Sequence, residues 1–132
     1  MKSSFSTSWK SSVQPRKQRK YRHNAPLHVK QKLMHSHIST DLRKKHGKRS
    51  LGLRKGDSVM IMRGQFRKKT GKVEQIDLKK SIVYVSGIDI TKKDGTKVRF
   101  PLQPSNLMIT EIMMDDKKRQ KSIGRKPNVR SS

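Results

Sequence analysis

Hydrophobic residues concentrate in the middle of the chain. Residues 51–114 contain 25 apolar side chains, whereas the other 68 positions contain 14. Within this middle segment, short apolar runs are separated by turns that contain glycine or proline, which is the pattern of β-strands. Short strands joined in this way predict a mainly β fold built on a small barrel. The runs predict strands at 57–62, 71–77, 81–85 and 107–112, and a hairpin around Asp94-Gly95.

The strand expected at 71–77 has an irregular pattern. Its apolar positions Val73 and Ile76 lie three residues apart, whereas strict alternation would separate them by two. An extra residue on one strand of a pair, a β-bulge, produces this spacing. We therefore predict a bulge between these two residues.

The segment before the strands has helical spacing. Pro26 suits the first turn of a helix, and apolar residues then recur at roughly helical intervals at Leu27, Leu33, Met34 and Ile38. We expect a helix at 26–38 whose apolar side packs against the barrel. Its other side, with Lys30 and Lys32, is then free to face a partner.

A second short helix is expected directly afterwards. Ser39 or Thr40 is suited to cap its start, with Asp41 in its first turn. Gly47 follows a basic segment and is a typical helix stop.

Positive charge is spread over the whole chain. It has 34 Lys and Arg against 9 Asp and Glu, a net charge of +25. Residues 1–50 contribute +13, residues 51–114 contribute +7 and residues 115–132 contribute +5. Segments with little apolar surface and this much like charge cannot fold alone. We therefore expect a basic, partly helical N-terminal extension (1–50), a barrel (51–114) and a basic C-terminal tail (115–132), in which Asp115 and Asp116 are suited to start a short helix.

The composition argues against catalysis. The chain has no cysteine, which excludes disulfides, thiol catalysis and cysteine-ligated metals. The acidic residues are scattered, and no nucleophile-elbow, Walker or dinucleotide-binding pattern occurs, so we expect no enzyme and no cofactor. His35 and His37 have a spacing that suits a metal, but Asp41 is the one acid nearby, so we expect no metal site.

The chain also lacks membrane and secretion signals. No apolar run approaches the length of a membrane span. The first ten residues lack the apolar core of a signal peptide. We expect a protein that stays inside the cell, with no membrane partner and no homo-oligomer.

A charge of +25 favours a polyanionic partner, and the connection between the first two strands is the first candidate site. Its two glycines permit unusual backbone conformations and close approach to a partner. Arginine forks bind phosphate oxygens in pairs, and lysine adds point charge. The alternative is a solvated loop that only keeps the protein soluble. We expect RNA contacts from Arg63, Gly64, Arg67, Lys68, Lys69, Gly71 and Lys72.

The basic run at 16–22 is the second candidate, and we expect it to lack a scaffold. Such a segment orders when it binds and can thread between RNA helices. Tyr21 has two open interpretations: it stacks on an unpaired base, or it packs on the barrel or the following helix. The contacts expected outside the first loop are Arg16, Lys17, Arg19, Lys20, Tyr21, Arg22, Lys30, Lys32, Arg54 and Lys55.

Three blocks of the sequence resemble one family. Residues 54–77 read R-K-G-D-S-V-M-I-M-R-G-Q-F-R-K-K-T-G-K-V-E-Q-I-D, which resembles the KOW motif. Residues 14–34 and 94–109 are similar to the N-terminal extension and the third block of a ribosomal family. This is the universal large-subunit ribosomal protein family number twenty-four, in its archaeal and eukaryotic branch. Transcription factors also carry KOW motifs, so the order of all three blocks carries the resemblance.

The resemblance implies an SH3-like barrel and a structural role in the large ribosomal subunit. It implies binding to the 5′ region of large-subunit rRNA, contact with neighbouring ribosomal proteins, a part in early subunit assembly and a position near the polypeptide exit tunnel of cytoplasmic ribosomes. One departure concerns the first candidate loop. The family often has Lys-Gly where this chain has Arg67-Lys68, so a cation replaces a loop glycine.

Two other interpretations of the residues stay open. A KOW transcription-elongation module usually follows a mixed α/β domain, and residues 1–50 are too short and too basic for one. A chromatin-like or membrane-surface polycation agrees with the basic ends. It does not explain the glycine-punctuated strands between them.

Overall fold

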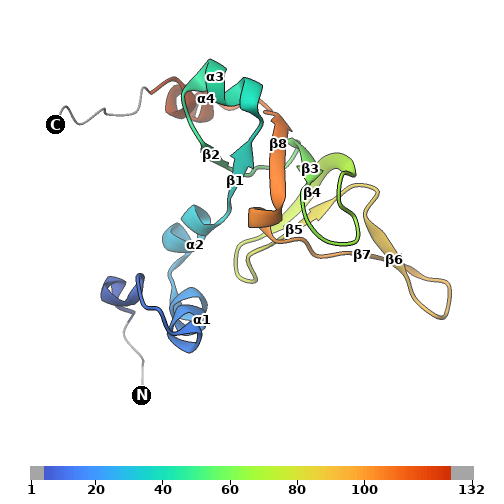
Figure 1. Ribbon diagram of the computed structural model, residues 1–132, viewed down its shortest axis with the longest axis horizontal. Helices are drawn as coiled ribbons and strands as arrows, with labels where there is room; N and C mark the ends of the chain where they lie inside the picture. Colours follow the sequence, from blue (N-terminus) through green and yellow to red (C-terminus); the bar gives the residue numbers. More distant parts are fainter. Residues whose placement is uncertain (1–4, 126–132) are drawn as a thin grey trace.

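The computed structural model describes residues 5–125, which form a mixed helix and sheet structure (Figure 1). The helical elements are η1 (Thr7–Trp9), α1 (Pro15–Asn24), α2 (Leu27–Leu33), α3 (Thr40–His46), η2 (Pro104–Asn106) and α4 (Lys117–Gly124). The strands are β1 (His35–Ile38), β2 (Ser50–Gly52), β3 (Ser58–Ile61), β4 (Thr70–Asp77), β5 (Ile82–Val85), β6 (Asp89–Thr91), β7 (Lys97–Arg99) and β8 (Leu107–Glu111).

The strands form an open sheet, so the small barrel that the sequence predicts is not closed. Six strands follow the order β2-β1-β8-β3-β4-β5, and β6 pairs only with β7. The reason lies in β8, which pairs with β3 on one side and runs parallel to β1 on the other. Both edges of β8 are therefore occupied, and it has none left to close a ring with β5. The mainly β expectation is likewise corrected, because helices make up much of the described chain.

The segment 26–38 was expected to be one helix, and that prediction is wrong in its second half. α2 ends at Leu33, and β1 begins at His35. β1 pairs antiparallel with β2 and parallel with β8, so sheet pairing overrides the helical spacing. Met34 and Ile38 are buried in the core, as apolar residues should be, but Leu27 is 58% exposed and packs on nothing that buries it.

The remaining secondary-structure predictions are largely confirmed. The register between β4 and β5 shifts between Val73 and Gln75, where a bulge was expected. Ser39 caps α3 by accepting a hydrogen bond from the Leu42 amide, and Gly47 ends that helix with a left-handed φ of 64°. The hairpin expected around Asp94-Gly95 is β6–β7. In Figure 1 it projects from the body, by which we mean the six-stranded sheet and the core packed on it.

The core lies against one face of this sheet. Alternate residues of β3, β5 and β8 are buried, as expected for strands with one covered face. Val59, Val83, Leu107 and Ile109 are fully buried there. Phe66 and Phe100 pack on the edge of the same cluster.

A buried ion pair fixes α4 to this body. Arg119 is 4% exposed and Asp57 is fully buried. The Arg119 guanidinium donates to both oxygens of the Asp57 carboxylate at 2.6 and 2.7 Å, and it also donates to the Gly52 and Met113 carbonyls. The backbone amides of Arg54 and Met113 donate to the same carboxylate. Asp116 starts α4 as its N-cap, as expected, but the sequence did not indicate the Arg119 contact.

Candidate nucleic-acid interface

The connection between β3 and β4 is held by its own backbone. The Lys68 amide donates to the Ile61 carbonyl at 2.8 Å, and the Ile61 amide donates to the Lys69 carbonyl at 2.9 Å. The Arg67 amide donates to the Gly64 carbonyl. The loop therefore has a defined conformation on a rigid sheet. Its cationic side chains are all exposed: Arg63, Arg67, Lys68, Lys69 and, at the start of β4, Lys72.

Phe66 attaches this loop to the body. Its ring is half-buried, and its centroid lies 5.1 Å from that of Phe100. The Lys69 ammonium lies 5.1 Å from the Phe66 centroid, within the range of a cation–π contact. Phe66 is not among the contact residues that the sequence predicts. A lone aromatic residue inside a basic, glycine-containing loop is the signal that indicates such an attachment.

The two glycines of the loop have different roles. Gly64 has a φ of 98°, which other residues avoid, and open space where a Cβ would lie. Gly71 lacks a positive φ, and a Cβ there would lie 2.6 Å from the Ser86 carbonyl oxygen. Gly71 is thus required by close packing against the chain's own β5 end. Gly71 does not use the unusual conformation that glycine permits, and the close approach is to the Ser86 carbonyl of the same chain.

Lys68 has a backbone conformation that glycine adopts more readily. Its φ is 70°, in the left-handed region that costs a non-glycine residue about 1–2 kcal/mol. Backbone hydrogen bonds on both sides of the loop hold it there. Lys68 therefore provides an exposed cation in the loop at some cost in stability.

The basic run at 16–22 lies on α1, a short helix without a buried residue, so the run is helical but the core does not support it. No residue of α1 is buried, and no side chain caps its N-terminus. The Gln18 side chain links α1 to the preceding segment by donating to the Lys10 and Ser12 carbonyls. Arg16, Arg19, Lys20 and Arg22 are exposed, and Lys17 is half-buried.

Tyr21 packs on the protein, but on neither of the expected surfaces. Its ring centroid lies 5.0 Å from that of Phe5, which precedes η1. This contact and the Gln18 hydrogen bonds join α1 to the segment before it. In Figure 1, α1 lies beyond α2 and away from the β3–β4 connection.

The other predicted contacts lie on the body. Lys32 and Lys55 are exposed. Lys30 is an exception, because it is only 9% exposed and its ammonium donates to the Lys79 carbonyl at 3.5 Å. Lys30 was expected to face RNA, and its burial contradicts that placement.

Arg54 is exposed and engaged in an ion pair with Asp116, the N-cap of α4. The side-chain hydrogen bond from Arg54 lowers the pKa of the Asp116 carboxyl, and the Lys118 amide adds to this effect. Arg54 therefore helps to hold α4, and it shares its charge with an acid.

Metal ligands do not come together in the part of the chain that the structure describes: no group of three or more His, Asp or Glu side chains is placed to hold an ion. Between residues 5 and 125, no helix has both the length and the apolar character that a membrane crossing requires.

Comparisons with known proteins agree on one family. A family model that describes the ribosomal proteins called L26 in eukaryotes and L24 in archaea matches residues 12–126. Large ribosomal subunit protein uL24 of Methanosphaera stadtmanae is 50% identical over 115 residues, which cover 87% of this chain and 98% of that protein. The uL24 protein of Methanothrix thermoacetophila is 47% identical over 114 residues, covering 86% of this chain and 98% of that protein. The matched range includes α1, the β3–β4 connection and α4.

Proposed function

Because the chain belongs to the family of the eukaryotic L26 and archaeal L24 ribosomal proteins, we propose that it binds the 5′ region of large-subunit rRNA through the β3–β4 connection and α1. Its place in the large ribosomal subunit follows from the family, and its role there is structural rather than catalytic. The proposal extends to early subunit assembly, to contacts with neighbouring ribosomal proteins and to a position near the polypeptide exit tunnel, in cytoplasmic ribosomes.

The β3–β4 connection carries the proposal. Five cations project from a short segment whose backbone is hydrogen-bonded and whose Phe66 ring packs on Phe100. A charged loop that only aids solubility has no need of such a fixed backbone. Fixed cations contact phosphates without a further loss of backbone entropy on binding. The family match over the same residues supports the interpretation.

α1 supplies the second contact. It presents cations on a short helix that packs on no buried surface. Such a helix can enter between RNA segments that the rigid body does not reach. Together the two surfaces neutralise phosphates of RNA segments that lie apart, and so favour the compact RNA fold. Selectivity then comes from RNA shape more than from base sequence.

A filter-binding titration tests the proposal. The full chain should bind a 5′ fragment of large-subunit rRNA with a log K that falls linearly with log salt, by about 0.7–0.9 for each phosphate contact. Arg67→Glu with Lys69→Glu should weaken binding strongly and reduce the slope. Lys92→Glu with Lys93→Glu, on the exposed β6–β7 turn, is the matched control with the same charge change.

Three outcomes contradict parts of the proposal. Equal weakening by both double variants means that net charge alone, and not the loop, carries binding. Equal affinity for duplex DNA indicates a general polycation. Equal affinity for a 3′ fragment of the same rRNA removes the 5′ assignment but leaves rRNA binding in place.

A further inference from the structure

A cavity on the body combines apolar and cationic side chains from distant parts of the chain. Its volume is about 850 Å³, within the range of about 300–1,000 Å³ that is typical of small-ligand sites. Residues 28–35, residues 51–55, the end of β4 and α4 supply its walls. It is separate from both the β3–β4 connection and α1.

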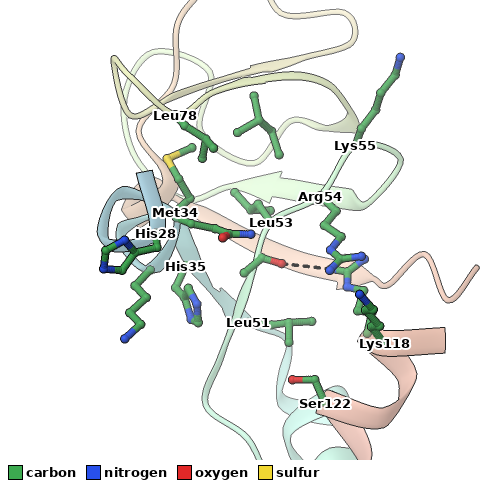
Figure 2. Close-up of a pocket in the computed structure, with 15 residues that line it drawn as sticks. His28, Met34, His35, Leu51, Leu53, Arg54, Lys55, Leu78, Lys118 and Ser122 are labelled. Carbon is green, nitrogen blue, oxygen red and sulfur yellow. Dashed lines mark hydrogen bonds between the residues drawn. The ribbon is translucent and has the colours of Figure 1, made fainter. Parts of the chain in front are cut away.

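The base of the cavity is apolar. Met34 and Leu53 are buried, while Leu51, Ile76 and Leu78 are half-buried and line the open space. Figure 2 shows Met34, Leu53 and Leu78 close together on one wall. Apolar carbon left at the bottom of an open cavity is stabilised when a ligand with an apolar face covers it.

The rim is cationic. Lys32 from α2, Lys55 from the loop before β3 and Lys118 from α4 are exposed and line the cavity. None of the described residues that line it is acidic. In Figure 2, Arg54 and Lys118 lie on one side and the two histidines, His28 and His35, on the other. The charge of the rim therefore favours an anionic ligand over a neutral or cationic one.

Groups that can pair with the edge of a nucleobase also line the cavity. Gln31 offers both a donor and an acceptor, and His28 and His35 add ring nitrogens. Partial burial lowers the pKa of His35, which favours the neutral ring, and a neutral ring offers one donor and one acceptor. A ligand with a flat apolar face, a hydrogen-bonding edge and a nearby negative charge matches the apolar, hydrogen-bonding and cationic groups that line the cavity.

We propose that this cavity binds one unstacked nucleotide of the RNA partner, with its base against Met34, Leu53 and Leu78. The phosphate then lies at the rim, between Lys32 and Lys118. This inference rests on the proposed RNA-binding function and adds a defined subsite to it. An acidic peptide is the competing macromolecular ligand, and without an aromatic residue it has no flat face to cover the apolar wall.

The subsite depends on α4. Lys118 precedes Arg119, whose bond to Asp57 holds this helix against the body. Ser122 of the same helix lines the cavity and accepts a hydrogen bond, through its carbonyl, from the Lys48 ammonium. The buried ion pair thus completes the wall that carries one of the phosphate-binding lysines.

Methyl NMR of the full chain, labelled at methionine and leucine, tests the subsite. The probes are the RNA tetramers rA4 and rU4, tripolyphosphate as a polyanion without bases, and hexaglutamate, all at one ionic strength. At least one tetramer should shift the methyl signals of Met34, Leu53 and Leu78 saturably, and neither base-free polyanion should do so. Lys32→Ala with Lys118→Ala should weaken this response about threefold or more. Lys92→Ala with Lys93→Ala, which remove the same charge elsewhere, should leave it within about twofold.

The outcomes separate this inference from the proposed function. If neither tetramer shifts these methyls while the chain still binds large-subunit rRNA in a salt-dependent way, the subsite is wrong and RNA binding stands. Equal shifts from tripolyphosphate mean that charge alone is recognised, which also overturns the subsite. Shifts from hexaglutamate without shifts from RNA make the cavity a peptide site. If the chain binds no rRNA at all, the proposed function itself fails.

Discussion

The β3–β4 connection and α1 carry the same number of cations but are held in different ways. The connection lies between two paired strands, its backbone is hydrogen-bonded, and Phe66 packs on Phe100. α1 has no buried residue, no side-chain N-cap and no acid in its first turn. Cations near a helix N-terminus oppose the helix dipole, and a ten-residue helix is marginal in water.

Because of this difference, RNA binding should cost less conformational entropy at the connection than at α1. Folding of the body already orders the connection, so RNA binding there costs little further entropy. The Tyr21–Phe5 contact and the Gln18 hydrogen bonds join α1 to the preceding segment. Because α1 has no buried residue, RNA must supply part of its stability. The β3–β4 connection should therefore determine the initial affinity and the position of the protein on the RNA, whereas α1 should become fully ordered only in the complex.

The largest effect should come from breaking the body that holds the connection. Arg119→Ala leaves the Asp57 carboxylate buried without its charged partner, which typically costs about 3–5 kcal/mol of unfolding free energy. Urea denaturation followed by circular dichroism measures the loss. Arg54→Ala, which removes the exposed pair with Asp116, is the control and should cost a small fraction of this. Equal losses would show that α4 is not fixed by the buried pair.

A proline in α1 should distinguish the contribution of α1 to rRNA binding from that of the β3–β4 connection. Lys20→Pro disfavours the helix by about 3 kcal/mol, while Lys20→Ala removes the same charge and retains the helix. Both variants should leave the urea midpoint of the body unchanged, because nothing in α1 is buried. The proline variant should bind rRNA several-fold more weakly than the alanine variant in the filter assay. Identical affinities would mean that α1 does not bind as a helix.

The close packing at Gly71 should matter more for stability than for RNA. Gly71→Ala brings a Cβ to 2.6 Å from the Ser86 carbonyl oxygen, and overpacking of this kind costs about 1–3 kcal/mol. Gly124→Ala, at a position with open space, is the matched control. Thermal unfolding checks both. At temperatures where the Gly71 variant is folded, the salt slope of its RNA binding should equal that of the unsubstituted chain.

The smallest effect concerns strain within the connection. Lys68→Gly relieves the left-handed φ of 70° and should raise the unfolding free energy by up to about 1 kcal/mol. The same change removes one cation and should lower the salt slope by about 0.7–0.9 if Lys68 contacts a phosphate. A stability gain without a change in slope would remove Lys68 from the RNA contacts and leave the strain argument intact.

Local signals in the sequence were read correctly where the cause is local. Ser39 and Gly47 bound α3, and the spacing of Val73 and Ile76 marks the bulge. The cations of the β3–β4 connection are exposed, as their composition predicts. Lys30 departs from its prediction: a basic residue on a helix is usually solvated, whereas Lys30 is buried and donates to the Lys79 carbonyl, 49 positions away.

The sequence alone determined the family, the polyanionic partner class, and the caps, turns and most strands, because charge and near-neighbour spacing are written directly in the chain. Tertiary structure decided the rest. Residues 35–38 form a strand because their backbone pairs with β2 and β8. The pairing of β1 with β8 also leaves the sheet open. Arg119 forms a buried ion pair with Asp57, because only folding brings positions 62 residues apart into contact.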